Sequence, residues 1–72
     1  MHKVEYQIWI GQRIRALRVE QGVSQRQLAL LANKDPQSLE RVENGKSCPT
    51  VFYLKEIMDA LGVSMVDFFD QT

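Results

Sequence analysis

Residues 37–46, QSLERVENGK, carry two amide side chains and an arginine at helical spacing. Gln37, Arg41 and Asn44 stand at i, i+4 and i+7, so at about 100° per residue they share a strip roughly 60° wide. Glutamine and asparagine carry paired donors and acceptors that match the edge of an adenine, and the arginine guanidinium matches O6 and N7 of guanine. The strip therefore has side-chain chemistry suited to reading bases in a major groove. The alternative is an ordinary solvated helix face, because polar strips of this kind are common.

The helix that would carry this strip has a clear beginning and a clear inner side. The carboxylate of Asp35 can accept from the free amides of a first helical turn, and Pro36 suits the first helical position. Leu39 and Val42 lie opposite the strip and are expected to face a core. Glu43 falls near Leu39 on the helical wheel, away from the strip. The sequence therefore predicts a helix that begins at Pro36 and presents its polar strip outward.

A shorter helix is expected directly before it. Ser24 followed three residues later by Gln27 forms a capping box, which predicts a helix beginning at Gln25. Its buried stripe is expected to be Leu28, Ala29 and Ala32. Asn33 tolerates a positive φ and is a plausible end, which leaves a turn of only residues 33–35. Two helices joined so tightly cannot lie antiparallel, and they resemble a helix-turn-helix unit.

The rest of the chain divides into three further helical segments. One covers residues 5–21 and ends at Gly22. Another follows a capping residue, Thr50, and ends at Gly62, and a last short one follows Ser64. The expected buried residues are Ile10, Ile14 and Leu17 in the first of these helices, and Val51, Leu54, Ile57, Met58 and Leu61 in the second. The pattern predicts an all-α fold of five helices.

Composition narrows the possible functions. A chain of 72 residues with no net formal charge forms one small domain with little room for a deep cleft. One histidine, one cysteine and no glycine-rich phosphate loop leave no catalytic residues, no metal site and no cofactor to expect, so the chain is not expected to be an enzyme. No small-molecule effector is evident. Because Cys48 is the single cysteine, no internal disulfide can form. Cys48 is expected to be a passive loop thiol, with oxidation sensing as the alternative.

The cysteine count and the apolar stretches predict where the protein resides, and the distribution of charge predicts a face that could approach polyanions. A single cysteine favours a reducing cytoplasm, and no apolar stretch approaches the roughly 20 residues that a membrane span needs. Residues 1–46 hold eight Lys or Arg against five Asp or Glu, whereas residues 47–72 hold one against four. This asymmetry predicts a basic face and an acidic back, and ordinary solvated surface is the alternative.

Four segments share an order and spacing with a known family. They are IGQRIRALR at residues 10–18, GVSQRQLALLA at 22–32, SLERVENGK at 38–46 and LGVSMVDFF at 61–69. Together they resemble the Cro/CI-type helix-turn-helix repressors, also called the XRE-like family. The resemblance implies a compact five-helix, lambda-repressor-like DNA-binding domain over residues 10–70. Residues 1–9 would be an N-terminal extension or the start of the first helix.

The resemblance also implies roles for individual residues. The third helix would enter the major groove with Gln37 and Arg41 reaching base edges, and Gln25 would share the readout or bond the DNA backbone. The residues expected at the DNA backbone are Ser24, Asn44, Lys46 and Ser47. Arg18 and Glu43 would form the family's ion pair and tie the first helix to the third. Helix amino termini favour phosphate without a basic side chain, so zero net charge is no obstacle to DNA binding.

Three residues depart from the family's pattern. Asn33 replaces the usual glycine, and Lys34 stands where a small apolar residue is usual, so the angle between the two helices is expected to differ slightly. Pro36 stands where the family commonly has a polar or basic side chain. Proline offers no donor, so this chain would read fewer bases there, or contact a thymine methyl.

The chain has more large apolar residues than so small a body can bury. They are Trp9, Phe52, Tyr53, Met65, Val66 and Phe69. Helix-turn-helix modules that read paired half-sites usually do so as two-fold dimers, so a homodimer surface is expected on the last two helices, at Met65, Val66 and Phe69. A monomer with an exposed apolar fringe is the alternative.

The function expected from all of this is a cytoplasmic, sequence-specific DNA-binding transcriptional regulator. It would be a repressor or autoregulator that binds a pseudo-palindromic operator in double-stranded DNA as a dimer. A controller of a restriction-modification operon is one candidate, because such proteins are similarly short and lack an effector domain. The alternative is a protein-interaction module, antitoxin-like or an adaptor subunit, that keeps the fold with weak or no DNA binding.

Overall fold

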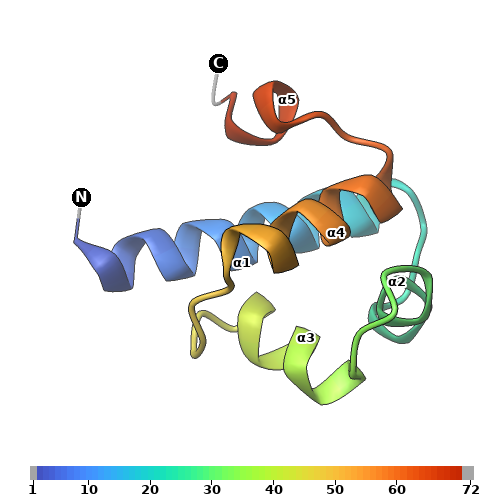
Figure 1. The fold of residues 1–72 in the computed structure, drawn as a ribbon, viewed down its shortest axis with the longest axis horizontal. Helices are drawn as coiled ribbons and strands as arrows, with labels where there is room; N and C mark the ends of the chain where they lie inside the picture. The colour runs from blue at the N-terminus through green and yellow to red at the C-terminus, as the bar shows by residue number, and fades with distance from the viewer. Residues whose placement is uncertain (1, 71–72) are drawn as a thin grey trace.

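The structure, a computed structural model, describes residues 2–70, and within them it contains five helices and no strand (Figure 1). The helices are α1 (Lys3–Glu20), α2 (Gln25–Leu31), α3 (Pro36–Glu43), α4 (Val51–Leu61) and α5 (Met65–Phe69). The predicted all-α, five-helix fold is confirmed. Because α1 begins at Lys3, residues 3–9 form the start of the first helix.

Four of the five helices begin at the capping side chain that the sequence predicts. Ser24 accepts from the backbone amide of Gln27 at 3.0 Å, and the Gln27 side chain accepts from the Ser24 amide at 2.8 Å, which completes the capping box. The other three caps are Asp35, Thr50 and Ser64. Asn33 has a φ of 56°, so the chain turns directly after α2 as expected.

The helices pack around one apolar core. In Figure 1, α1 and α4 cross the middle of the molecule and pack against each other, with α2 and α3 on one side and α5 on the other. The buried apolar residues are Ile14, Leu28, Ala29, Ala32, Leu39, Val42, Leu54, Ile57, Met58, Leu61 and Phe68. α3 contacts α1 and α2, so the core fixes the inner side of this short helix.

One expected core residue lies outside. Val51 was predicted to be buried on α4, but it is 76% exposed. It is the first residue of the helix, one turn before the buried stripe begins at Leu54. Helical side chains lean toward the amino terminus, so Val51 projects beyond the end of the core.

The helices of the described part of the chain are too short or too polar to cross a membrane.

Candidate nucleic-acid interface

The outer side of α3 carries the three polar side chains of the predicted strip. Gln37, Arg41 and Asn44 are all exposed, whereas Leu39 and Val42 on the opposite side are buried. Within residues 2–70, none of the three exposed side chains holds a hydrogen bond or an ion pair with another residue. Their donors and acceptors are therefore available to a ligand, while the other side of the helix is held in the core.

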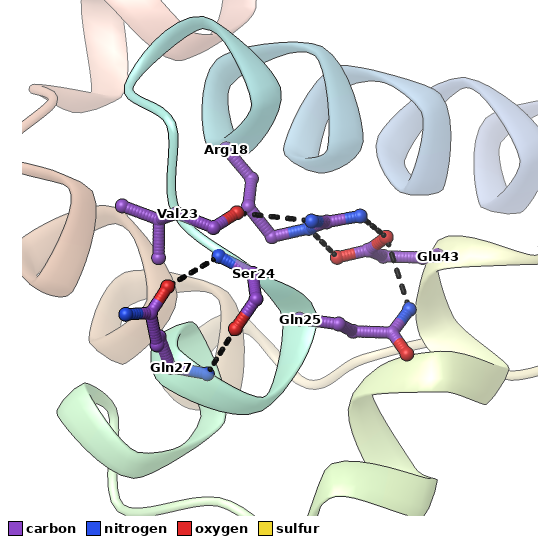
Figure 2. A network of polar contacts seen from close by, with 6 residues as sticks. All are labelled: Arg18, Val23, Ser24, Gln25, Gln27 and Glu43. Atoms are coloured by element: carbon purple, nitrogen blue, oxygen red, sulfur yellow. Dashed lines mark hydrogen bonds and ion pairs between the residues drawn. The ribbon is translucent and has the colours of Figure 1, made fainter.

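The end of α3 is tied to α1 by a buried ion pair. Arg18 donates from Nε to Glu43 Oε2 at 2.8 Å and from Nη2 to Glu43 Oε1 at 3.0 Å (Figure 2). Its Nη1 donates to the carbonyl oxygen of Val23 at 3.0 Å, so the same guanidinium also holds the segment that leads into α2. The structure thus contains the pair expected between Arg18 and Glu43. A planar guanidinium facing a carboxylate with two parallel bonds fixes orientation as well as distance.

Gln25 joins the start of α2 to this ion pair. Its Nε2 donates to Glu43 Oε1 at 3.1 Å, and Figure 2 shows its carbonyl oxygen pointing away from the carboxylate. The amide nitrogen must face Glu43, because two oxygens in contact would repel each other. The expected DNA-contacting side chain is therefore half-buried and partly engaged, with the carbonyl oxygen and one N–H still unused.

The residues expected at the DNA backbone lie in two segments, at the start of α2 and after the end of α3. The hydrogen bond from Gln25 to Glu43 brings these segments together. Ser24 precedes Gln25 at the exposed start of α2, and Asn44 follows Glu43 at the end of α3. Lys46 is exposed in the following turn, where its backbone amide donates to the carbonyl oxygen of Arg41 at 2.9 Å. Ser47, the fourth expected backbone residue, lies half-buried directly after it. The free amides at the start of α2 thus lie close to the polar end of α3, an arrangement suited to binding phosphate.

The close crossing of α1 and α3 at Gly11 was not predicted from the sequence. A Cβ on this residue would lie 2.5 Å from the carbonyl oxygen of Glu43 and closer still to that of Val42. Only glycine lets the backbone of α1 approach the last turn of α3 so closely. The available signal was a glycine inside a helical pattern, where alanine would be the better helix former. Nothing in the local sequence identifies the segment that approaches it.

The predicted association residues lie exposed on α5. Met65 and Val66 are exposed, and the ring of Phe69 stacks on Trp9 of α1 at a centroid distance of 5.7 Å. Arg13 holds the helix in place by donating to the carbonyl oxygens of Asp67 and Phe68, both at 2.9 Å. This five-residue helix is therefore anchored on α1 and leaves an apolar side open.

Comparison with known proteins agrees with this geometry. The helix-turn-helix family model HTH_3 matches residues 14–68. The HTH-type transcriptional regulator PuuR of Escherichia coli (strain K12) is 30% identical over 61 residues, which are 85% of this chain and 33% of PuuR. The chain therefore spans about a third of the length of that relative.

Two solved structures show the same arrangement of helices. The restriction-modification controller protein C.AhdI from Aeromonas hydrophila matches with a TM-score of 0.86 and 29% identity, over 90% of this chain and 98% of that one. The controller protein C.Esp1396I, solved as a tetramer in complex with its natural 35 base-pair operator, matches with a TM-score of 0.85 and 29% identity, over 96% of this chain and 88% of that one. The resemblance to Cro/CI-type, XRE-like proteins is thereby confirmed, and the chain belongs to the HTH_3 helix-turn-helix family.

Proposed function

We propose that this chain is a DNA-binding transcriptional regulator that recognises its operator with the exposed strip of α3 and acts as a dimeric repressor or autoregulator. The observation that carries the proposal is the two-sided character of α3. Gln37 and Arg41 are exposed and unpaired within residues 2–70, while Leu39 on the opposite side is fully buried. Such a helix can enter a major groove without unfolding any part of the domain.

Some of the side chains on this surface contact base edges, and others contact phosphates. Arg41 offers a fork to guanine, and Gln37 offers a donor and an acceptor to adenine. Gln25, turned by Glu43, offers its carbonyl oxygen and one N–H at the edge of this surface. The residues that bind phosphate are Ser24, Asn44, Lys46 and Ser47, together with the free amides at the start of α2. Phosphate contacts fix the position of the helix, and base contacts select the sequence.

In a dimer, two copies of α3 can contact the two half-sites of one operator. The open apolar side of α5, with Met65, Val66 and Phe69, is the surface by which two copies associate. A two-fold dimer reads a pseudo-palindromic operator, because the symmetry of the protein is repeated in the DNA. C.Esp1396I binds its own operator as a tetramer, which supports an oligomeric form for this chain.

The role in regulation also predicts the location of the protein, its lack of enzymatic activity and its class of target. The protein works in the cytoplasm, where it has access to DNA, and it has no enzymatic activity and needs no cofactor. PuuR is a transcriptional regulator, and C.AhdI controls a restriction-modification system. Operators of restriction-modification operons are therefore the first class of target to test.

Selection from a pool of random duplexes by gel shift tests the proposal. We expect the wild-type chain to enrich one site with two-fold symmetry, and its affinity to fall with salt at a log–log slope of about −0.9 for each phosphate neutralised. A chain that enriches no sequence would instead be a protein-interaction module that keeps the fold, and the proposal would be wrong. An enriched site without symmetry would contradict the dimer alone.

A further inference from the structure

Four half-buried side chains tie the beginning of α3 to α4. Lys34, in the turn before α3, forms an ion pair with Glu56 and lies over the ring of Tyr53, with its ammonium 4.7 Å from the ring centroid. The Tyr53 hydroxyl lies 2.9 Å from the hydroxyl oxygen of Ser38, in the first turn of α3. We name these residues, Lys34, Ser38, Tyr53 and Glu56, the α4 clamp.

The α4 clamp and the Arg18–Glu43 pair hold opposite ends of the same helix. α3 has eight residues, so at about 1.5 Å per residue its two ends lie roughly 12 Å apart. The α4 clamp holds the chain on both sides of Pro36, through Lys34 before it and Ser38 after it. Each end is therefore fixed by a different element of the domain, and the two anchors together set the tilt of α3.

Gln37 lies inside the stretch that the α4 clamp holds. It is the residue directly before Ser38, whereas Asn44 follows Glu43 at the far end. A small tilt of α3 about its end at Glu43 would move Gln37 most and Asn44 least. Paired hydrogen bonds to a base edge weaken steeply when donor and acceptor lose their alignment, so such a tilt would weaken base reading at Gln37.

We propose that the α4 clamp is a positioning device for base recognition, an inference that rests on the proposed function. It fixes the height and tilt at which the first turn of α3 enters the groove, and so sets how well Gln37 meets its base pair. The phosphate-binding residues Ser24 and Lys46 are held by other contacts. Loosening the α4 clamp therefore lowers affinity for the operator and leaves affinity for random duplex unchanged.

The polar atoms of the α4 clamp lie outside the apolar core, so they can be substituted without opening that core. The Lys34 and Glu56 side chains are 19% and 31% exposed, so both keep contact with water, whereas the Glu43 side chain is only 2% exposed. The Tyr53 hydroxyl likewise lies outside the apolar core. A substitution confined to these polar atoms can therefore change the tilt of α3 in a domain that remains folded.

Tyr53→Phe tests the inference because it removes one hydroxyl and keeps the ring. We expect affinity for the site selected by the wild-type chain to fall about threefold to tenfold, the range of one hydrogen bond. Affinity for random duplex and the salt slope should stay at their wild-type values, and the thermal unfolding temperature should fall by only a few degrees, so that the domain remains folded in the binding assay. Ser38→Ala should give the same loss, and the double variant should lose no more than either single one, because both remove the same bond.

Repeating the selection with Tyr53→Phe shows where specificity is lost. The relaxed base pair should be the one that Gln37→Ala also relaxes, and the base pair relaxed by Arg41→Ala should keep its preference. The matched control is the other ion pair of α4, between Lys55 and Asp59, which is exposed and does not involve α3. Lys55→Met should leave selection unchanged, whereas Lys34→Met should broaden it as Tyr53→Phe does.

The outcomes distinguish this inference from the function on which it rests. If the wild-type chain selects a site and Tyr53→Phe selects it with the same ratio of operator to random affinity, the α4 clamp has no positioning role. An equal loss on operator and random duplex would also overturn it, because it would place Tyr53 in general binding or folding. If the wild-type chain selects no site, the proposed function and the inference are both wrong.

Discussion

Arg18 and Glu43 meet through two parallel hydrogen bonds, 2.8 and 3.0 Å long, that join α1 to the end of α3. The Glu43 side chain is only 2% exposed, so Arg18→Ala would leave a buried carboxylate without its cation. We expect the free energy of unfolding to fall by about 3 to 5 kcal/mol, measured by urea denaturation. Replacing both partners, as Arg18→Met with Glu43→Leu, should cost clearly less, since no charge is then left buried. Equal losses in the single and double variants would contradict this account of the pair.

Gly11→Ala is expected to destabilise the protein although it improves helix propensity. Propensity alone would raise stability by about 0.5 to 1 kcal/mol. The added Cβ would meet the carbonyl oxygens of Val42 and Glu43, and overpacking of this kind typically costs about 1 to 3 kcal/mol. Thermal or urea unfolding gives the sign of the net effect. Gln12→Ala, at the next and exposed position of α1, is the control and should change stability by less than about 0.5 kcal/mol.

The local features of this fold could be predicted from the sequence. Helix beginnings depend on residues three apart in the chain, so Ser24 with Gln27, and Asp35 with Pro36, contain the information needed to place α2 and α3. The outward strip on α3 depends only on helical periodicity, and Leu39 defines its opposite side.

Contacts between distant residues could not be predicted in the same way. The approach of Gly11 to the end of α3, and the ion pair of Lys34 with Glu56, depend on how helices cross in three dimensions. Val51 was misplaced because periodicity does not show where the core ends. The engagement of Gln25 by Glu43 was not foreseen, because a polar residue at a helix start can face a ligand or a neighbouring helix equally well.

Val66→Glu is expected to break the proposed dimer without unfolding the domain. The side chain is 78% exposed, so the substitution leaves the core intact and places a charge on the open side of α5. In a two-fold dimer the change occurs twice, and each copy loses the burial of a valine, worth about 1.5 to 3 kcal/mol. Sedimentation at micromolar concentration should therefore show a monomer. Leu30→Glu, at a 72% exposed position on α2, is the control and should sediment like the wild-type chain.

Lys46→Ala is expected to weaken binding to every duplex alike. The residue is exposed in the turn after α3, where its ammonium would neutralise a phosphate and read no base. The log–log slope of affinity against salt should become shallower by about 0.9, on the selected operator and on random duplex. Titrations at several salt concentrations measure this. A loss confined to the operator would show that Lys46 contributes to base reading.

Sequence-specific recognition by this chain depends most directly on Arg41, because its guanidinium is expected to read a base from the exposed side of α3. The measurement is a selection from random duplexes, run in parallel with the wild-type chain and Arg41→Ala. The predicted result is one enriched site for the wild-type chain, and for the variant the same site with a single relaxed base pair in each half, by about 1 to 3 kcal/mol. An Arg41→Ala variant that keeps the wild-type preference at every position, or a wild-type chain that enriches no site, would contradict the account.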